Sequence, residues 1–491
     1  MIPEALLAPV AVVLVPFVGA AAIALAGDRD RLRDALGWIT ALAFFAGVSA
    51  QVGPVLAGAG REQHVWTLMP GLDIAFAVEP LGLIFALVAA TLWLVATLYA
   101  QCYMKALGYK HLGRFFACYA IALGAAAGVA FSANLLTLFV FYEVLSLSTY
   151  PLVAHSGTSK ARDGARIYLG YLLTTSIGLL LVAVLWVWHA AGTLEFTPGG
   201  IIAGNVDPVW IPLLAGLFMF GIGKAALMPV HRWLPAAMVA PAPVSALLHA
   251  VAVVKAGVFS VLKVAVFVFG TDTLVTTGAG LWVSWVAAFT IVAASLIALR
   301  LEDLKARLAY STISQLNYIV LGAMVATPLA VIGAAMHIAM HAVAKITLFF
   351  GAGAIQVAHD RKKVAELDGL GRAMPITFGT FALATLSIIG LPLFGGAWSK
   401  WYLVLGSLEA HQWVLVGALM ASSLLNILYL LVIPIRAFFA RPADGVPGHY
   451  AEAPWPMLAA MLITATGCVL LFFWPDPLYR VASMLVAGGA P

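Results

Sequence analysis

Long apolar stretches alternate with short polar connections along the whole chain, and this pattern predicts a protein built from membrane-spanning helices. A helix needs about 20 predominantly apolar residues to cross the hydrocarbon core of a bilayer. Fourteen stretches meet this requirement, namely 5–26, 35–57, 80–101, 115–131, 134–154, 166–191, 210–230, 243–269, 280–299, 307–326, 329–357, 375–408, 412–434 and 455–474. The connections are too short for a soluble domain, and the longest, near 58–79, 193–209 and 435–454, are expected to be loops. The predicted fold is therefore all-α, with about 14 transmembrane helices.

Composition strengthens this prediction. Of the 491 residues, 63% are hydrophobic and only 10% are charged, whereas a soluble domain has about 25% charged residues. These values exclude a water-soluble enzyme and a disordered chain, and the three cysteines form no CxxC pair or disulfide framework. Residues 5–26 are expected to be a membrane helix and not a signal peptide, because the preceding residues contain Glu4 and no basic residue.

The distribution of basic residues predicts an orientation. With the N-terminus outside, fourteen crossings place 19 lysines and arginines in inner loops and only 2, Arg61 and Arg480, outside. The positive-inside rule expects this asymmetry. The chain is thus predicted to be a multi-pass protein of the cell (inner) membrane with both termini on the outer face. The basic residues are scattered through short loops, so the net charge of +5 does not indicate nucleic-acid binding.

Six ionisable residues lie inside apolar stretches: Glu143, Lys224, Lys255, Lys263, Lys345 and Lys400. A charge at mid-membrane costs roughly 2.5–3.5 kcal/mol on insertion scales, so such residues usually serve a function. Lys263 lies near the end of its stretch and has a second interpretation, in which its side chain extends to the membrane interface. His249 is either a hydrogen-bonded core residue or part of the functional set.

His337, His341 and Lys345 recur every four residues and share one helix face over roughly 12 Å. The two histidines have a spacing that could hold a metal, but zinc needs further ligands and no nearby cysteine or carboxylate offers one. Histidine titrates near neutrality. A buried series of groups that bind and release protons is typical of a proton relay, so we expect a relay facing the protein interior and no metal or cofactor.

Glu143 and Lys224 are predicted to form a buried pair of opposite charges. If the two partners move apart, each changes its proton affinity, so the pair can act as a switch. The alternative is a permanent buried salt bridge, which adds little stability.

Two predicted helices are interrupted at their lysines. One break lies around Lys224, in GIGKAALMPVHRWLP, and the other precedes Lys400, in GLPLFGGAWSK. Paired breaks of this kind indicate inverted repeats with sites near the midplane. EVLSLSTY and STISQLNY also match, Ser146 with Ser314 and Tyr150 with Tyr318. The expected organisation is 1–114 for helices 1–3, 115–269 and 280–436 for two inverted five-helix repeats, and 437–491 for the last helix.

NLLTLFVFYEVLSLSTYPLV, GIGKAALMPVHRWLPAAMVAPAPVSALLHAVAVVKAGVF, the HxxxHxxxK run and LPLFGGAWSKWYL together resemble the antiporter-like subunits of complex I and of the multisubunit Mrp cation/proton antiporters. The resemblance covers most of the chain and implies a proton path through a hydrated polar axis at mid-membrane. The roles it implies are a fifth-helix glutamate (Glu143), its seventh-helix lysine (Lys224), a connecting lysine (Lys255) with His249 beside it, a relay (His337, His341 and Lys345) and a terminal lysine (Lys400).

Lys400 within SKWYL resembles the D-type subunit of Mrp antiporters. This resemblance implies a proton-conducting subunit that works with other membrane subunits in the bilayer and exchanges protons for Na⁺ or another monovalent cation. The alternative is an M- or N-type pump subunit of a complex I-like NADH:quinone oxidoreductase or membrane-bound hydrogenase. A stand-alone solute transporter is a weaker third interpretation. The chain has no cofactor motif, so any redox chemistry would belong to partner chains, and it is not expected to be catalytic alone.

Overall fold

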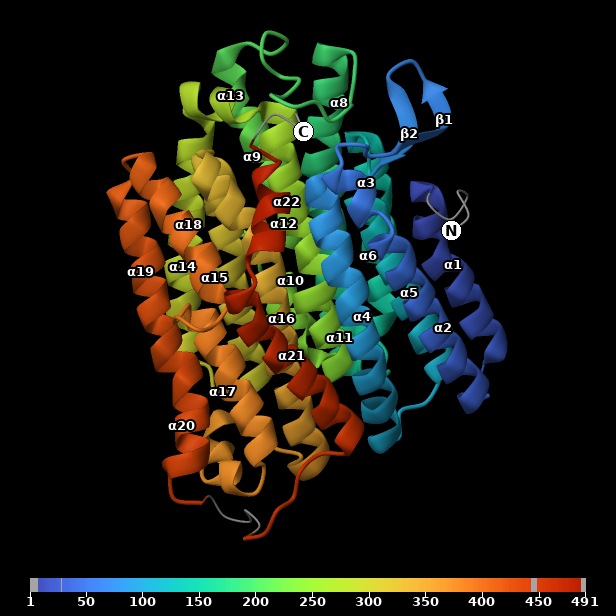
Figure 1. Ribbon diagram of the computed structural model, residues 1–491, viewed down its shortest axis with the longest axis vertical. Helices are drawn as coiled ribbons and strands as arrows, with labels where there is room; N and C mark the ends of the chain where they lie inside the picture. Colours follow the sequence, from blue (N-terminus) through green and yellow to red (C-terminus); the bar gives the residue numbers. More distant parts are fainter. Residues whose placement is uncertain (1–7, 28, 443–447, 487–491) are drawn as a thin grey trace.

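The computed structural model describes residues 8–27, 29–442 and 448–486, and these residues form a helical bundle with one β-hairpin (Figure 1). The helices are α1 (Pro9–Ala26), α2 (Asp30–Ser49), α3 (Val52–Leu56), α4 (Pro80–Ala106), α5 (Leu112–Ala130), α6 (Leu135–Val153), α7 (Ser159–Thr175), α8 (Leu181–Ala191), α9 (Ile211–Gly221), α10 (Trp233–Ala236), α11 (Ala242–Ala246), α12 (Val253–Val264), α13 (Thr271–Thr276), α14 (Ala279–Arg300), α15 (Leu304–Val325), α16 (Pro328–His359), α17 (Pro375–Ile389), α18 (Gly396–Glu409), α19 (Trp413–Asn426), α20 (Val432–Phe439), α21 (Trp455–Phe473) and α22 (Asp476–Ser483). The hairpin strands are β1 (Glu62–Met69) and β2 (Leu72–Ala77).

Within these residues, 12 helices are long and apolar enough to cross a membrane. Three of them continue through a π-helical turn, which joins α7 to α8, α11 to α12 and α19 to α20. The other two predicted spans are the interrupted ones. The helix α9 covers only the first part of 210–230, and α17 and α18 divide 375–408 between them. The all-α membrane fold and both breaks are therefore confirmed.

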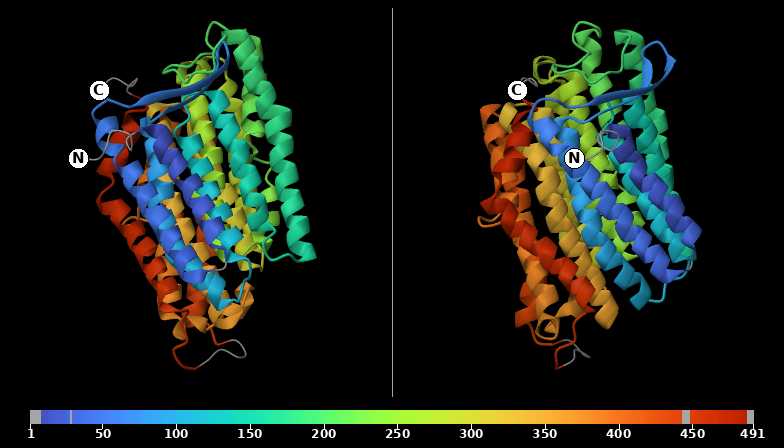
Figure 2. Two further views of the ribbon diagram at one scale, coloured as in Figure 1. Left: turned by 90° about the vertical axis from the view of Figure 1, so that its right-hand side faces the viewer. Right: turned by 45° about the vertical axis from the view of Figure 1, so that its right-hand side comes forward.

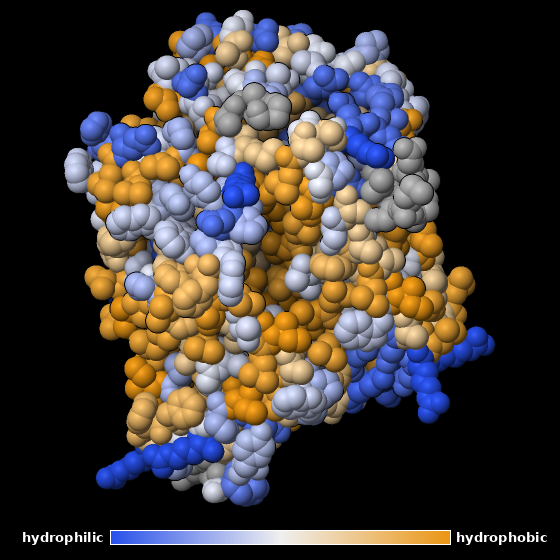
Figure 3. Space-filling model, in the orientation of Figure 1, coloured by the Kyte–Doolittle hydropathy of each residue, from blue (hydrophilic) through white to orange (hydrophobic). Residues whose placement is uncertain are grey.

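The bundle has two distinct ends (Figures 1 and 2). The hairpin end carries β1–β2, the α8–α9 connection and α13, and α1 begins and α22 ends there (Figure 1). The basic end carries the α6–α7, α14–α15 and α16–α17 connections, which meet around one cavity. On the face in Figure 3, apolar side chains predominate in the middle and hydrophilic ones gather toward the ends. Which membrane face each end occupies stays a prediction from charge.

The segment 58–79 differs from the loop expected there, because it folds into β1 and β2. The strands pair antiparallel on either side of Pro70 and Gly71. Gly71 has φ of 76°, a left-handed conformation that glycine adopts without steric cost. Since the prediction searched only for long apolar runs, it missed this short hairpin, which Phe76 joins to Ser132 at the start of α6.

The centre of the bundle consists of α16 and the α11–α12 span. All of the most apolar window of 242–269 is buried, and α16 packs against α4, α12, α15, α17, α18 and α21. The helix α16 begins after Thr327, whose hydroxyl accepts the Ala330 N–H, and ends where Asp360 turns left-handed with φ of 48°. Polar side chains on these two spans therefore lie inside protein and not against lipid.

Candidate functional site

The break after α9 sets the position of Lys224. Freed backbone groups inside a membrane need partners from neighbouring elements. The N–H of Lys224 donates to the Tyr142 hydroxyl at 3.0 Å, and the indole N–H of Trp233 donates to the Gly223 carbonyl at 2.9 Å. Gly257 of α12 packs directly on the Lys224 backbone, where a Cβ would collide with it. The break is thus a fixed structure held by α6 and α12.

The Lys224 ammonium is fully buried and held by α6. It donates to the Tyr142 carbonyl at 2.8 Å and to the Ser146 hydroxyl at 2.6 Å. It also lies 3.1 Å from the centroid of the Tyr142 ring, a cation–π contact. Tyr142 and Ser146 are four residues apart and so present one helix face to the lysine.

Glu143 does not form the direct contact with Lys224 that the sequence predicts. Within the described residues, no ion pair joins them within 4 Å, and both buried carboxylate oxygens of Glu143 lack a hydrogen bond. The reason is helical geometry, because Glu143 is turned about 100° around α6 from Tyr142. Glu143 still interacts electrostatically with the ammonium.

A line of polar groups joins α12, α16 and α18. Lys255 Nζ lies 2.7 Å from His341 Nδ1. The His341 and His337 ring centroids are 5.6 Å apart, and His337 Nδ1 lies 2.8 Å from the Ser399 hydroxyl. All four side chains are buried. Proton-binding groups from two spans and a hydroxyl from a third are therefore contiguous.

Lys345 and His249 flank this line without joining it directly. Lys345 is also buried, and its ammonium donates to the Ser311 hydroxyl of α15 at 2.7 Å. His249 lies in the π-helical turn before α12 and packs on Phe349 at 4.5 Å between ring centroids. Neither of its ring nitrogens has a hydrogen bond within the described part of the chain. The interior location expected for His337, His341 and Lys345 is confirmed by their burial.

Lys400 lies on α18 just after the second break. Its ammonium donates to the Ile389 carbonyl at the end of α17 (3.2 Å) and to the Ser423 hydroxyl of α19 (3.1 Å). It also lies 4.8 Å from the centroid of the Tyr318 ring. Since His337 stacks on the same ring at 5.7 Å, Tyr318 connects Lys400 to the histidines.

The two halves correspond in a different register from the expected one. The match of Tyr150 with Tyr318 does not hold at the lysines, because Tyr142 underlies Lys224 as Tyr318 underlies Lys400. In both halves the tyrosine and the lysine are 82 residues apart in the chain. The correspondence therefore rests on tyrosine–lysine pairs.

Lys263 does not extend to the membrane interface, so that interpretation is wrong. It is 1% exposed and forms an ion pair with Glu79 at 2.6 Å. Its ammonium also donates to the Ser132 carbonyl at 2.6 Å. Lys263 therefore ties α12 to the start of α4, apart from the polar line.

The sequence analysis missed the hydroxyl partners of the buried cations, Ser311, Ser399 and Ser423. The available signal was a serine inside a long apolar span, but serine also commonly bonds to its own helix backbone. Among the described residues, no three His, Cys, Asp or Glu side chains lie together in a way that could hold a metal ion.

Comparisons with known proteins identify the family. Residues 132–426 match the family described as NADH:quinone oxidoreductase/Mrp antiporter, TM. NADH-quinone oxidoreductase subunit N of Desulforudis audaxviator is 33% identical, over 94% of this chain and 95% of that protein. A Na(+)/H(+) antiporter subunit of Alkalihalophilus pseudofirmus is 29% identical over 85% of this chain, which spans only 55% of that longer protein.

A chain in the structure of the Mrp complex from Dietzia sp. has the same fold. It superimposes with a TM-score of 0.85 over 98% of this chain and 97% of its own length, at 22% identity. Together with the family match over more than half of the sequence, these relatives define what kind of protein this is. The chain belongs to the NADH:quinone oxidoreductase/Mrp antiporter transmembrane family and is a proton-translocating, antiporter-like membrane subunit of an Mrp or complex I-like assembly.

Proposed function

We propose that this chain conducts protons within a multisubunit monovalent cation/proton antiporter of the Mrp type. The observation that carries the proposal is the contact of 2.7 Å between Lys255 Nζ and His341 Nδ1, continued by His337 to Ser399. Proton transfer between side chains requires hydrogen-bond reach, about 2.6–3.2 Å, or one bridging water. The Lys255–His341 contact meets this requirement without rearrangement, and the stacked histidines can be bridged by water.

Unpartnered polar atoms support a hydrated path. The Nε2 atoms of His337 and His341 and both ring nitrogens of His249 are buried and have no partner in the described structure. Buried polar atoms in proteins are nearly always hydrogen-bonded, to protein or to ordered water. Water molecules at these atoms would extend the line of proton-transferring groups toward Lys345 and Lys400.

Three observations favour the Mrp type. Lys400 is a lysine at the second break, as in D-type Mrp subunits, one relative belongs to a Na(+)/H(+) antiporter, and the fold matches a chain of an Mrp complex. In this proposal, residues 115–269 and 280–436 are the two inverted repeats, and Glu143 with Lys224 forms the switch of the first. The partners are other membrane subunits, and the exchanged ion is Na⁺ or another monovalent cation.

A second candidate function is an N-type proton pump of a redox complex. The match to the N-type relative extends over 95% of that protein, whereas the Na(+)/H(+) antiporter relative is nearly twice as long as the aligned region. In that case partner chains supply the redox energy, and the polar line has the same task.

The two candidates are separated by the driving force. The complex that carries this chain is purified from its native membrane and reconstituted into vesicles with a pH-sensitive dye inside. An Mrp-type subunit predicts a pH gradient on adding Na⁺ or K⁺ without a reductant, lost in the His341→Gln complex. A pH gradient that requires an electron donor and is insensitive to Na⁺ and K⁺ would contradict the antiporter and favour the pump. A gradient that is unchanged in the variant would contradict conduction along the polar line.

A further inference from the structure

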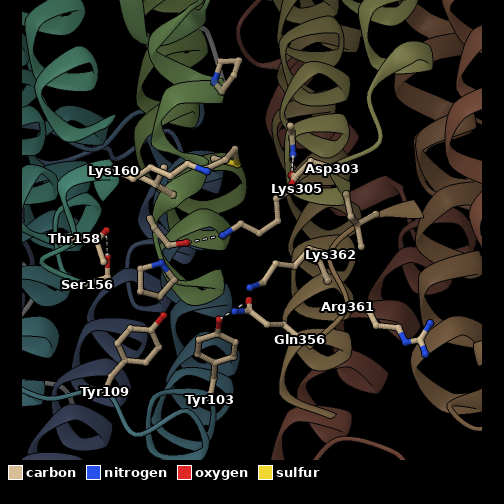
Figure 4. Close-up of a pocket in the computed structure, with 18 residues that line it drawn as sticks. Tyr103, Tyr109, Ser156, Thr158, Lys160, Asp303, Lys305, Gln356, Arg361 and Lys362 are labelled. Atoms are coloured by element: carbon tan, nitrogen blue, oxygen red, sulfur yellow. Dashed lines mark hydrogen bonds between the residues drawn. The ribbon is translucent and has the colours of Figure 1, made fainter. Parts of the chain in front are cut away.

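A cavity of about 530 Å³ opens at the basic end, apart from the polar line (Figure 4). It lies between α4, α7, α15, α16 and the connection that precedes α11. A volume of 300–1,000 Å³ is typical of small-molecule sites. The chemistry of its lining therefore decides what it could hold.

Three lysine ammonium groups point into this cavity from different segments (Figure 4). Lys160 comes from the first turn of α7, Lys305 from the first turn of α15, and Lys362 from the α16–α17 connection. Lys305 donates to the Ala240 carbonyl at 2.5 Å. Asp303, the acidic residue in the lining, accepts the N–H of Ala306 as the N-cap of α15.

These lysines lack the carboxylates that other cations at this end possess. Lys105 pairs with Asp34 at 2.5 Å, and Arg436 pairs with Asp368 at 2.7 Å. Within the described residues, neither Lys160 nor Lys305 has an ion pair within 4 Å, and Lys362 reaches Asp360 alone, at 3.2 Å. Like charges gathered at one cavity repel each other, so the arrangement is favourable when an anion occupies it.

Neutral donors complete the lining. The hydroxyls of Ser156 and Thr158 lie 3.4 Å apart on one wall. Tyr103 donates to Gln356 on another wall, and Tyr109 lies beside Tyr103. Burial raises the pKa of the Tyr109 hydroxyl, so it remains a protonated donor. Hydroxyl donors together with lysine ammonium groups suit an anion that has several acceptor oxygens.

We propose that this cavity is a binding site for a phosphate group. The group is inorganic phosphate or the headgroup of an anionic phospholipid, which present the same charged oxygens. Basic pockets between membrane helices on the cytoplasmic side bind such headgroups. Lys160, Lys305 and Lys362 supply the charge, and the hydroxyl-bearing walls supply the remaining hydrogen bonds.

The test measures phosphate-dependent thermal stabilisation of the full chain in nanodiscs. One arm titrates inorganic phosphate into discs of neutral phosphatidylcholine, and the other replaces part of that lipid with phosphatidylglycerol. In at least one arm we expect a saturable rise in Tm. The Lys160→Gln/Lys362→Gln variant should bind about 30-fold more weakly, because each lysine near a headgroup contributes about one 5-fold factor. This variant keeps Lys305 and its bond to Ala240, so that it can fold.

The matched control is Arg29→Gln/Arg31→Gln, which removes the same charge from exposed residues at the basic end. It should keep the wild-type affinity, as should Lys160→Arg/Lys362→Arg. A response to phosphate alone identifies a free anion, and a response to phosphatidylglycerol alone identifies a lipid headgroup. No response in either arm, or an equal response in wild type and the Gln variant, would overturn the proposal. An acidic protein segment that copurifies on the cavity, in place of phosphate, would also overturn it.

Discussion

Lys224 in the first half of the chain and Lys400 in the second have the same kind of surroundings. Each lies at a break in its helix, over a tyrosine ring, and donates to a serine hydroxyl and to a main-chain carbonyl. A cation inside a membrane needs such partners because water is largely absent. The shared arrangement shows that neither lysine requires a direct salt bridge to be held in place.

The two sites differ in counter-charge and enclosure. Glu143 lies beside the first site, whereas no carboxylate in the described residues lies within ion-pair distance of Lys400. Lys224 is completely buried, but Lys400 is 6% exposed and lines an apolar cavity of about 660 Å³ with Trp398 and Trp401. We infer that a fixed carboxylate controls the charge of Lys224, while whatever enters the cavity controls that of Lys400.

The largest expected effect is at the first site. Lys224→Ala and Glu143→Ala should each abolish proton transport in vesicles, because removing one charge leaves the other uncompensated in the membrane, at roughly 2.5–3.5 kcal/mol. The measurement is pH-gradient formation at matched expression. Lys110→Ala, at an exposed position of the basic end, is the control. Near-normal transport in either variant would remove that residue from the mechanism.

The second site gives the next largest effect. Lys400→Arg should lower the transport rate by about tenfold or more, equal to ~1.4 kcal/mol in the barrier, because arginine keeps its charge at any accessible pH and cannot release a proton. Lys105→Arg, which preserves the ion pair with Asp34, is the control. Full activity of Lys400→Arg would make Lys400 an electrostatic anchor instead of a proton carrier.

The sequence was sufficient to predict the spans, the two breaks and the buried cations. Spans follow from the length of apolar runs, and breaks follow from glycine and proline inside them, so both are local properties. The same reasoning placed Lys345 inside the bundle, because a lysine in mid-span must find polar surroundings.

Contacts between distant segments could not be predicted in this way. Lys255 and His341 are 86 residues apart in the chain, and helical periodicity gives the face of each residue but not the helix that the face meets. Glu143 shows the same difficulty, since its neighbour Tyr142, with its carbonyl and ring, took the place expected for the carboxylate.

The histidines connect the two sites and should give smaller effects. His341→Gln should lower transport several-fold and flatten its pH profile between about pH 6 and 8, because glutamine keeps hydrogen bonding but removes a group that titrates near neutrality. His337→Gln should lower it less, since His341 contacts Lys255 directly and water can bypass His337. A chelator should have no effect on the wild type. Stoichiometric bound zinc, or equal rates in both variants and the wild type, would contradict the relay.

The smallest effect sharpens the comparison at the tyrosines. Tyr142→Phe and Tyr318→Phe both keep the ring beneath the lysine, so transport should change little, but stability should differ. The Tyr142 hydroxyl accepts the Lys224 N–H at the break, and its loss leaves a buried donor unsatisfied, which costs about 1–3 kcal/mol. The Tyr318 hydroxyl donates to the Leu419 carbonyl at 2.9 Å. That carbonyl keeps its bond within α19, so its loss costs about 0.5–1.5 kcal/mol.

Thermal unfolding of the purified variants in one detergent measures this difference. Tyr142→Phe should have the lower Tm of the two, and Tyr450→Phe, at an exposed position in the α20–α21 connection, should match the wild type. If Tyr318→Phe were equally destabilised, the two breaks would depend on their tyrosines to the same degree. The first break is secured by a hydroxyl on its backbone and the second by the Lys400 ammonium on the Ile389 carbonyl. Lys400 therefore has both a structural task and a proton to carry, and the order of these two Tm values tests that division of labour.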